Sequence, residues 1–386
     1  MQNVYLDHAA TTPMDPEVLE VMTPYFTETF GNPSSIYSFA SKSRAAIEKA
    51  REQVAVALNA LPEEIFFTSS GTEADNWALK GTFEKAKGGH IITTQIEHHA
   101  VLYTGEYLEK TGGADVTYLP VDAEGRVRME DLRAVVTDKT ALVSIMFANN
   151  EIGTIQPIEE IGRFCRERGI LFHTDAVQAA AQVDIDVKAL SIDMMSLSAH
   201  KMYGPKGTGA FYLRRGLKLE NFVHGGGQEK GKRASTENVA GIVGMGVAIE
   251  KMKTRLPQEK PRLSALRDRL IDGVLKAIPH AKLNGARGEE RLPNNANFSF
   301  IGVEGETLLL DLDAKGISAS TGSACTSGSL EPSHVLMALG LTHEEAHGSL
   351  RLTLGRGTSD AQIDYVLDVL PQIVAKRREM SPIWRA

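Results

Sequence analysis

The chain has 386 residues, 42% hydrophobic and 24% charged, with a formal net charge of −7. This is the composition of an ordinary globular protein, and the length favours two domains over one. The acidic balance argues against nucleic acid as a partner, and no apolar run is long enough to cross a membrane. The first seven residues lack the features of a signal peptide. Only two cysteines, Cys165 and Cys325, are present, which excludes a disulfide framework and favours a cytoplasmic location.

The N-terminal region predicts an extended lead-in followed by helices. Residues 4–6 have the pattern of a short strand, and the polar, threonine-rich residues after them are expected to line a site. Asp15 precedes Pro16, a pair that predicts a helix start with Asp15 as the N-cap. A Gly-Asn-Pro loop then leads to a long amphipathic helix over 41–58.

From residue 64 onwards, short apolar runs alternate with helical patterns. The predicted strands are 65–68, 90–94, 116–119, 141–147, 170–173 and 210–213. Alternation of this kind predicts a mainly parallel sheet covered by helices, in which ligands bind beyond the carboxyl ends of the strands. Polar clusters follow four of these strands, at 68–73, at 97–99, at 149–151 and at Asp175.

Two loops have the composition of phosphate-binding loops. The turn Ser-Ser-Gly-Thr opens a helix near Gly71, where it is either an anion site or a plain capping turn. The Gly-rich loop 223–238 is either a flexible linker or a phosphate contact made through Arg233, Ser235 and Thr236.

The C-terminal third predicts a second domain. A helix over 242–252 connects to it, and the expected elements are a strand at 297–301, helix 306–315, strand 317–319, the Cys325 loop, a strand in R-L-T-L-G-R and a final helix. The predicted division is therefore a segment 1–14 that lines the site and joins the small domain, a large domain 15–256 and a small domain 257–386.

The stretch from His173 to Gly207 carries the strongest chemical signal. Asp175 follows a buried-strand pattern, and Lys201 lies among small and hydroxylated residues before a Gly-Pro turn. A lysine presented inward loses its proton more easily and can attack a carbonyl carbon. The pair indicates a pyridoxal-phosphate site, with Lys201 as the Schiff-base residue and Asp175 as the partner of the pyridine nitrogen. The alternatives are a surface lysine and a helix-capping aspartate.

The two cysteines have different settings. Cys165 lies in a helical pattern, which predicts a packed side chain. Cys325 lies in a loop of small polar residues where nothing large can bury the sulfur, which predicts a reactive thiol.

With these residues in place, the chain resembles the cysteine desulfurases of the nitrogen-fixation type (the NifS/IscS group), relatives of the class V aminotransferases. The resemblance runs nearly end to end, through Y-L-D-H-A-A-T-T-P, F-T-S-S-G-T-E, E-H-H-A-V, N-N-E-I-G, H-T-D-A-V-Q, S-A-H-K and G-S-A-C-T-S-G-S-L-E-P-S-H-V. It implies an α/β fold of the aspartate aminotransferase type. In this fold a large domain with a mainly parallel seven-stranded sheet carries a smaller α+β C-terminal domain.

The resemblance also implies roles around the cofactor ring. Lys201 would hold the aldehyde and later move the proton of the substrate α carbon, while Asp175 would keep the ring nitrogen protonated. Gln178 would bind the phenolic oxygen, His98 would stack on the ring, and Asn150 would lie near the ring oxygen and the substrate.

Further roles concern the phosphate, the substrate and the sulfur. The implied phosphate contacts within one chain are Gly71, Thr72, Ser198 and His200. Thr236 would reach the phosphate of a partner subunit, which implies a homodimer, and Arg351 would bind the substrate carboxylate. L-cysteine would yield L-alanine and a persulfide on Cys325, which would serve an iron–sulfur scaffold protein and could transiently ligate iron.

Departures from the family pattern and alternative functions accompany this interpretation. Tyr37 and Ser235 stand where relatives usually have histidine and glycine. The alternatives are a selenocysteine lyase or another transaminating or β-eliminating relative, a non-catalytic assembly platform, and a metal hydrolase built from His98, His99, His173 and Asp175. The sulfur acceptor is left open among nitrogenase clusters, general iron–sulfur assembly and tRNA thiolation.

Overall fold

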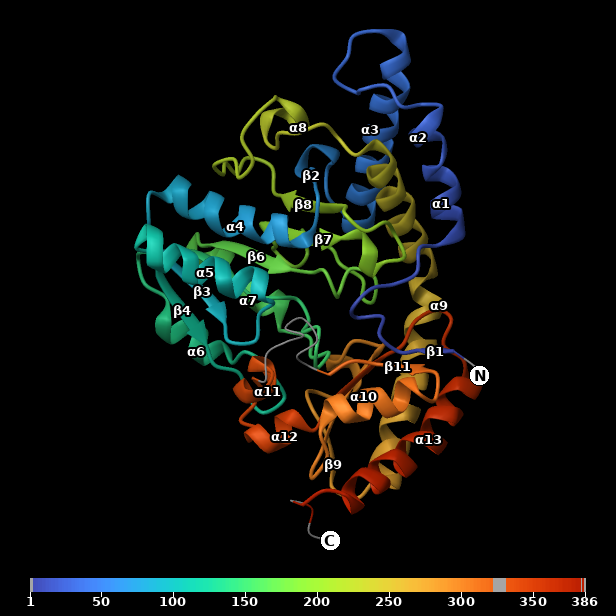
Figure 1. Cartoon of the computed structure of the whole chain (residues 1–386). Helices are drawn as coiled ribbons and strands as arrows, with labels where there is room; N and C mark the ends of the chain where they lie inside the picture. The colour runs from blue at the N-terminus through green and yellow to red at the C-terminus, as the bar shows by residue number, and fades with distance from the viewer. Residues whose placement is uncertain (1–2, 322–330, 383, 385–386) are drawn as a thin grey trace.

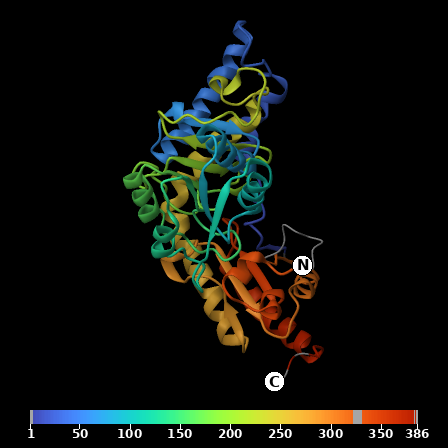
Figure 2. The same ribbon diagram turned by 90° about the vertical axis from the view of Figure 1, so that its left-hand side faces the viewer.

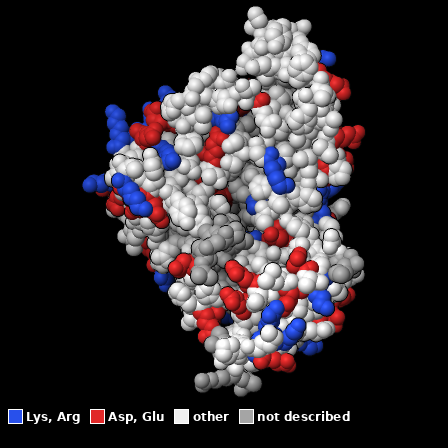
Figure 3. Space-filling view, in the orientation of Figure 1, with Lys and Arg blue, Asp and Glu red and all other residues white. Residues whose placement is uncertain are grey.

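The computed structural model describes residues 3–321, 331–382 and 384, so Cys325 lies outside the described residues. Two sheets of different size organise the chain, and the long helix α9 (Val239–Ala277) runs past both (Figures 1 and 2). Among the described residues, no helix is both long and apolar enough to span a membrane. Acidic and basic side chains are interspersed on the face shown in Figure 3.

The large sheet has seven strands in the order β2-β8-β7-β6-β5-β3-β4. β8 runs antiparallel to both neighbours, whereas the other four strand pairs are parallel. The mainly parallel seven-stranded sheet is therefore confirmed. The strands are β2 (Ile65–Thr68), β3 (His90–Thr94), β4 (Asp115–Leu119), β5 (Thr140–Ser144), β6 (Leu171–Asp175), β7 (Met194–Ser198) and β8 (Gly209–Leu213).

Helices cover both faces of this sheet. Neighbouring residues of one strand enter different cores, as Leu142 and Val143 of β5 do, because side chains alternate across a strand. One core packs against α3 (Ser38–Leu58), α6 (Met129–Val135), α7 (Ile158–Arg168) and the first half of α9; the other packs against α4 (Gly71–Ala86) and α5 (His99–Gly112).

The predicted helix start at Asp15 is confirmed. The Asp15 side chain accepts a hydrogen bond from the N–H of Glu17 and caps α1 (Pro16–Met22), whose first residue is Pro16. The short helix α2 (Pro24–Thr27) follows, and α8 (Gln228–Gly231) lies in the Gly-rich loop. Short 3-10 turns are η1 (Pro62–Glu64), η2 (Ala199–Lys201) and η3 (Gly288–Glu290).

The small sheet is antiparallel, in the order β12-β10-β9. Its strands are β9 (Ala281–Leu283), β10 (Asn295–Phe300) and β12 (Ser349–Thr353), and β1 (Val4–Tyr5) pairs separately with β11 (Ile317–Ser318). The helices of this region are α10 (Gly305–Asp313), α11 (His334–Ala338), α12 (His343–His347) and α13 (Asp360–Glu379).

Two sequence-based element predictions were wrong. β7 was not recognised as a strand, because its two serines broke the apolar pattern, yet all five of its residues are buried. The helix predicted over 242–252 was too short, because α9 continues through Pro257 and Pro261 to Ala277. Packing of both halves of α9 outweighs the cost of the prolines.

The proposed division at residue 257 therefore falls inside one helix. Before it, Met252 packs in a core of the large sheet, and after it, Leu263 packs in the core of the small sheet. Val4 and Leu6 also join the core of the small sheet. The division into a large and a small domain stays a prediction.

Candidate active site

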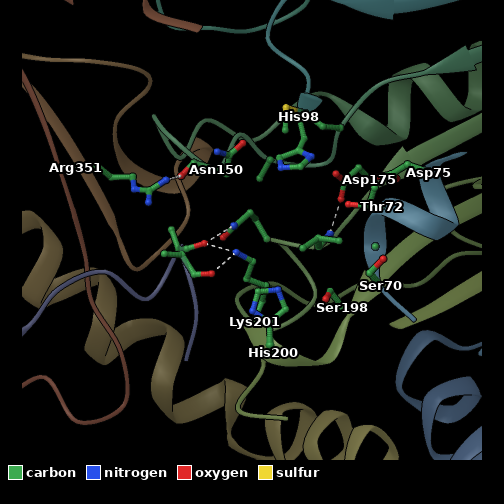
Figure 4. Close-up of a pocket in the computed structure, with 17 residues that line it drawn as sticks. Ser70, Thr72, Asp75, His98, Asn150, Asp175, Ser198, His200, Lys201 and Arg351 are labelled. Carbon is green, nitrogen blue, oxygen red and sulfur yellow. Dashed lines mark hydrogen bonds between the residues drawn. The ribbon is translucent and has the colours of Figure 1, made fainter. Parts of the chain in front are cut away.

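A cavity of about 300 Å³ lies beyond the carboxyl ends of strands of the large sheet. It is lined from the N-terminal segment, from loops after five strands of the large sheet and from β12 of the small sheet. Figure 4 shows its side chains converging from these elements. The lining residues are Ala9, Ala10, Ser70, Gly71, Thr72, Asp75, His98, Met146, Ala148, Asn150, Asp175, Val177, Gln178, Ser198, His200, Lys201 and Arg351.

Ten of the twelve site residues predicted from the sequence line this one cavity. The structure brings together Gly71, Thr72, His98, Asn150, Asp175, Gln178, Ser198, His200, Lys201 and Arg351. Thr236 is exposed and is not among the lining residues, and Cys325 lies outside the described residues. The structure places the ten lining residues, and the individual roles of all twelve stay predictions.

The N-terminus of α4 forms one wall of the cavity. Ser70 caps the helix by accepting a hydrogen bond from the N–H of Glu73. A Cβ atom at Gly71 would lie 2.5 Å from Cγ2 of Val177, so the wall has no room for a side chain at this position. Helix N-termini attract anions because their first N–H groups have no partner within the helix. Ser198 and His200 add polar side chains to the same cavity.

Lys201 follows β7 through the short turn η2. Its Nζ donates hydrogen bonds to the carbonyl oxygens of Ala9, at 2.5 Å, and Ala10, at 2.7 Å. Nε2 of Gln178 also donates to the Ala9 oxygen, at 2.9 Å. The N-terminal segment is therefore a wall of the cavity, held there by the two side chains with predicted roles.

Asp175 ends β6, and its carboxylate accepts a hydrogen bond from the N–H of Val177 at 2.9 Å. Burial raises the pKa of the Asp175 carboxyl to about 6, against the opposing effects of this hydrogen bond and the charge of Lys201. Asp75 is only 1% exposed, and burial followed by repulsion from Asp175 raises its pKa well above the usual range. A cationic or proton-bearing group beside Asp175 would offset these costs.

Sequence reasoning missed Asp75. The signal was present, because Gly71 and Asp75 are four residues apart and therefore share one face of α4. One oxygen of Asp75 has no hydrogen-bond partner in the described part of the chain, although Nε2 of His173 lies 3.7 Å from it.

His98 is the N-cap of α5 and a neutral base. Its Nδ1 accepts a hydrogen bond from the N–H of Ala100 at 3.1 Å, which assigns the ring proton to Nε2. Burial lowers the pKa of His98 to about 4, and the charges of Lys201 and His99 lower it further. Burial also lowers the pKa of His200 to about 4.

Arg351 reaches the cavity from β12 and is 3% exposed. Its Nη1 donates to the carbonyl oxygen of Asn150 at 3.1 Å, and Nη2 pairs with Asp7 at 2.9 Å. Its buried Nε has no hydrogen-bond partner among the described residues. In Figure 4, Arg351 and Asn150 lie at one end of the cavity, opposite Asp175 and Thr72. The contact with Asp7 was not foreseen.

The metal-hydrolase alternative finds no support in this arrangement. The ring nitrogens of His173 face two hydroxyls, Ser144 Oγ at 2.8 Å and Ser196 Oγ at 3.0 Å. Over the described stretches, no group of three or more histidine, cysteine, aspartate or glutamate side chains is placed to hold a metal ion.

Comparison with known proteins assigns the family. Residues 4–366 match the family described as aminotransferase class V. The chain belongs to this family. Its members, with the cysteine desulfurases among them, depend in general on pyridoxal phosphate, and the predicted family is confirmed.

Two relatives are similar over almost their whole length. The chain is 63% identical to the protein named cysteine desulfurase IscS of Clostridium botulinum, over 99% of this chain and 97% of that protein. It is 57% identical to the protein of the same name from Methanosarcina thermophila, over 98% and 94% of the two chains.

Solved structures confirm the fold. A NifS-like protein with 40% identity superposes with a TM-score of 0.91, over 97% of this chain and all of that chain. The structure described as SspA in complex with cysteine, also 40% identical, has a TM-score of 0.81 and covers 91% of this chain and 98% of its own.

Proposed function

We propose that this protein is a cysteine desulfurase that uses pyridoxal phosphate to convert L-cysteine into L-alanine and a persulfide on Cys325. The observation that carries the proposal is the placement of Lys201 and Arg351 around one cavity. An amine that can hold an aldehyde and a guanidinium that can hold a carboxylate are the two groups that an amino-acid substrate requires. The near full-length similarity to proteins named cysteine desulfurase supports the same activity.

The residues of the cavity fit the cofactor. The first turn of α4, with Ser198 and His200, would hold the phosphate, and Val177 packs so closely against Gly71 that only glycine fits at this turn. Asp175 would hold the proton of the ring nitrogen, with Lys201 at the aldehyde. When bound, pyridoxal phosphate supplies an electron sink for the electron pair of the substrate α carbon.

Each of the protein's own groups then has one task. Arg351 binds the substrate carboxylate through its unpaired Nε and orients the α C–H bond. The amine of Lys201 would take the proton from the substrate α carbon and later return a proton to the substrate. His98 is neutral, so it can approach the ring without adding positive charge beside Lys201.

The sulfur step balances without an external oxidant. The Cys325 thiolate attacks the substrate sulfur, an S–S bond forms, and the bond between that sulfur and the substrate β carbon breaks. The β carbon gains a proton, which gives L-alanine and a persulfide. A thiol has a pKa of about 8.5, so the thiolate is the reactive form that the site must favour.

Replacing Cys325 tests the assignment. With a thiol reductant present to release the persulfide sulfur as sulfide, we expect Cys325→Ala to release no sulfide from L-cysteine while keeping the absorbance of the bound cofactor at roughly 400–430 nm. The matched control is Cys165→Ala, because Cys165 is buried in α7 with a raised pKa and should not affect turnover. Sulfide release by Cys325→Ala at the wild-type rate would overturn the proposal.

The proposal extends to partners and location. We take the active form to be a homodimer in which Thr236, exposed on the Gly-rich loop, contacts the phosphate of the partner's site. An iron–sulfur scaffold protein would accept the sulfur, and Cys325 could then ligate iron transiently. The low cysteine content supports a cytoplasmic location.

A further inference from the structure

We infer that Glu151 is a positioning residue for sulfur transfer, because it fastens the chain just after the Cys325 segment to the turn that carries Asn150. The Cys325 segment is the stretch 322–330 between the described residues 321 and 331. The inference rests on the proposed function, since it assigns Glu151 a part in delivering the thiol that this function requires.

The described residues on both sides of the Cys325 segment are tied to the substrate end of the cavity. Before it, Ser320 exchanges two backbone hydrogen bonds with Arg351, of 2.7 and 3.2 Å. After it, Oγ of Ser333 donates to Oε2 of Glu151 at 2.5 Å. Arg351 and Asn150 are joined in turn by a 3.1 Å hydrogen bond at this end of the cavity. The chain thus enters and leaves the Cys325 segment beside the groups proposed to hold the substrate.

Glu151 is itself rigidly placed. Oδ1 of Asn149 accepts the N–H groups of Glu151 and Ile152, at 2.8 and 3.0 Å, and so fixes the turn. The carbonyl oxygen of Glu151 accepts from the side-chain amides of Asn295 and Asn297 on β10, at 3.0 and 3.1 Å. The backbone of Glu151 is therefore bonded both to the turn after β5 and to β10 of the small sheet, and this fixes the position from which its carboxylate binds Ser333.

The start of α11 makes a second contact with the same wall. Nε2 of His334 lies 3.0 Å from the carbonyl oxygen of Glu97, the residue before His98. The next two residues, Val335 and Leu336, pack in an apolar cluster with Ile96 and Ile152. Apolar packing is non-directional, whereas the hydrogen bond of Ser333 has a preferred direction and so fixes the position of the start of α11.

Stability alone does not account for a carboxyl group at this position. Glu151 is 5% exposed, and burial raises its pKa to about 7, against the opposing effects of the Ser333 hydrogen bond and Arg351. Burying an ionisable group costs free energy that an apolar side chain of similar size would not cost. The Glu151 carboxylate is explained if it positions the chain that carries Cys325 by accepting a hydrogen bond of fixed direction from Ser333. A small displacement of a reacting group can lower the reaction rate by a large factor.

The test separates substrate binding from sulfur transfer in the holoenzyme. We expect Glu151→Ala and Ser333→Ala to bind L-cysteine as the wild type does, by the change in cofactor absorbance and by KM. Alanine formation in a single turnover should slow about tenfold, the loss expected for a hydrogen bond worth roughly 1.4 kcal/mol. Glu151→Gln and Ser333→Thr keep the acceptor and the hydroxyl, so each should restore most of the rate.

A matched control comes from the neighbouring helix. Oγ1 of Thr342 caps α12 by accepting a hydrogen bond from the N–H of Glu345, as Ser333 caps α11, but no hydrogen bond joins Thr342 to Glu151. Thr342→Ala should leave the single-turnover rate unchanged. Wild-type rates in both alanine variants, an equal loss in cysteine binding, or the same loss in Thr342→Ala would each overturn the inference. Failure of the proposed function is distinct, because the wild type itself would then form no alanine from L-cysteine.

Discussion

Glu97 lies between β3 and α5 and is 1% exposed, and burial raises the pKa of its carboxyl to about 8. Its Oε1 accepts from Thr94 at 2.8 Å and from the N–H of Met146 at 2.9 Å. The folded protein therefore keeps a neutral acid on this wall at pH 7. The raised pKa of Glu97 cannot be inferred from the residue type, because the shift depends on how completely the fold excludes water from the carboxyl group.

Glu97 gives the folded state a pH dependence of known sign. The pKa of Glu97 in the folded protein is higher than the 4.5 of a free glutamate, so the folded state binds more protons than the unfolded state in this range. The free energy of unfolding therefore falls as the pH rises from about 4.5 to 8. We expect Glu97→Gln, which cannot ionise, to remove about 2–3 kcal/mol of the loss in unfolding free energy between pH 6 and 9. Urea unfolding of the holoenzyme across this range measures it.

An exposed glutamate serves as the control for this titration. The Glu130 side chain is 80% exposed, so Glu130→Gln should follow the wild-type curve. Parallel pH curves for Glu97→Gln and the wild type would show that the buried carboxyl does not titrate as described.

Ser235 carries backbone strain. Its φ is +90°, in the region that favours glycine. Ser235→Gly should raise the unfolding free energy by about 1 kcal/mol in urea titration. The same change at Ser41, exposed within helix α3, should lower it by roughly 0.5–1 kcal/mol. A loss of stability at both positions would argue against strain at Ser235.

At the scale of elements, the Gly-rich loop 223–238 is held by two ion pairs. Arg51 pairs with Glu229 at 2.7 Å, with both side chains almost fully buried. Arg233 makes two hydrogen bonds with Glu73 of α4, at 2.8 and 3.0 Å. The first contact attaches the loop to α3 and the second attaches it to α4, whose N-terminus lines the cavity, so the linker interpretation of this loop does not hold.

Loosening the loop should weaken cofactor retention. We expect Arg233→Ala to lower the unfolding free energy by about 1–2 kcal/mol, because Glu73 loses its partner in a partly buried setting. Pyridoxal phosphate should also dissociate several-fold faster during gel filtration. Arg215→Ala, which removes an exposed pair with Glu63 at 3.5 Å, should change neither quantity. Equal retention in the two variants would contradict the anchoring role.

Most elements could be predicted from local patterns, and the failures have physical causes. Asp15 and Pro16 marked a helix start because capping and a fixed proline φ are local effects. The strand β7 could not be predicted because Ser196 and Ser198 interrupt its apolar pattern. In the structure both serines are buried between neighbouring strands, and the hydroxyl of Ser196 is hydrogen-bonded to His173. The second half of α9 could not be predicted from the sequence, because its prolines disfavour a helix and only tertiary packing stabilises one there.

At the scale of the whole molecule, complementation tests the homodimer. Lys201→Ala should be inactive, and Thr236→Ala should bind the cofactor weakly. A mixed dimer of the two has one site with an intact Lys201 that receives an intact Thr236 from the partner. Co-expression should therefore recover up to half the wild-type activity per mixed dimer. No recovery in purified mixed dimers would place Thr236 outside the partner's site.

The sequence by itself determined the family, the class of fold and ten residues of one cavity, because motifs at the ends of parallel strands meet at one sheet edge. Only the tertiary structure decided that Asp75 lines the same cavity, that Asp7 pairs with Arg351, which pKa values shift, and that Glu151 meets Ser333. These depend on burial and on contacts between residues far apart in the chain, such as Asp7 with Arg351. No local pattern encodes such distances, since the fold as a whole sets them.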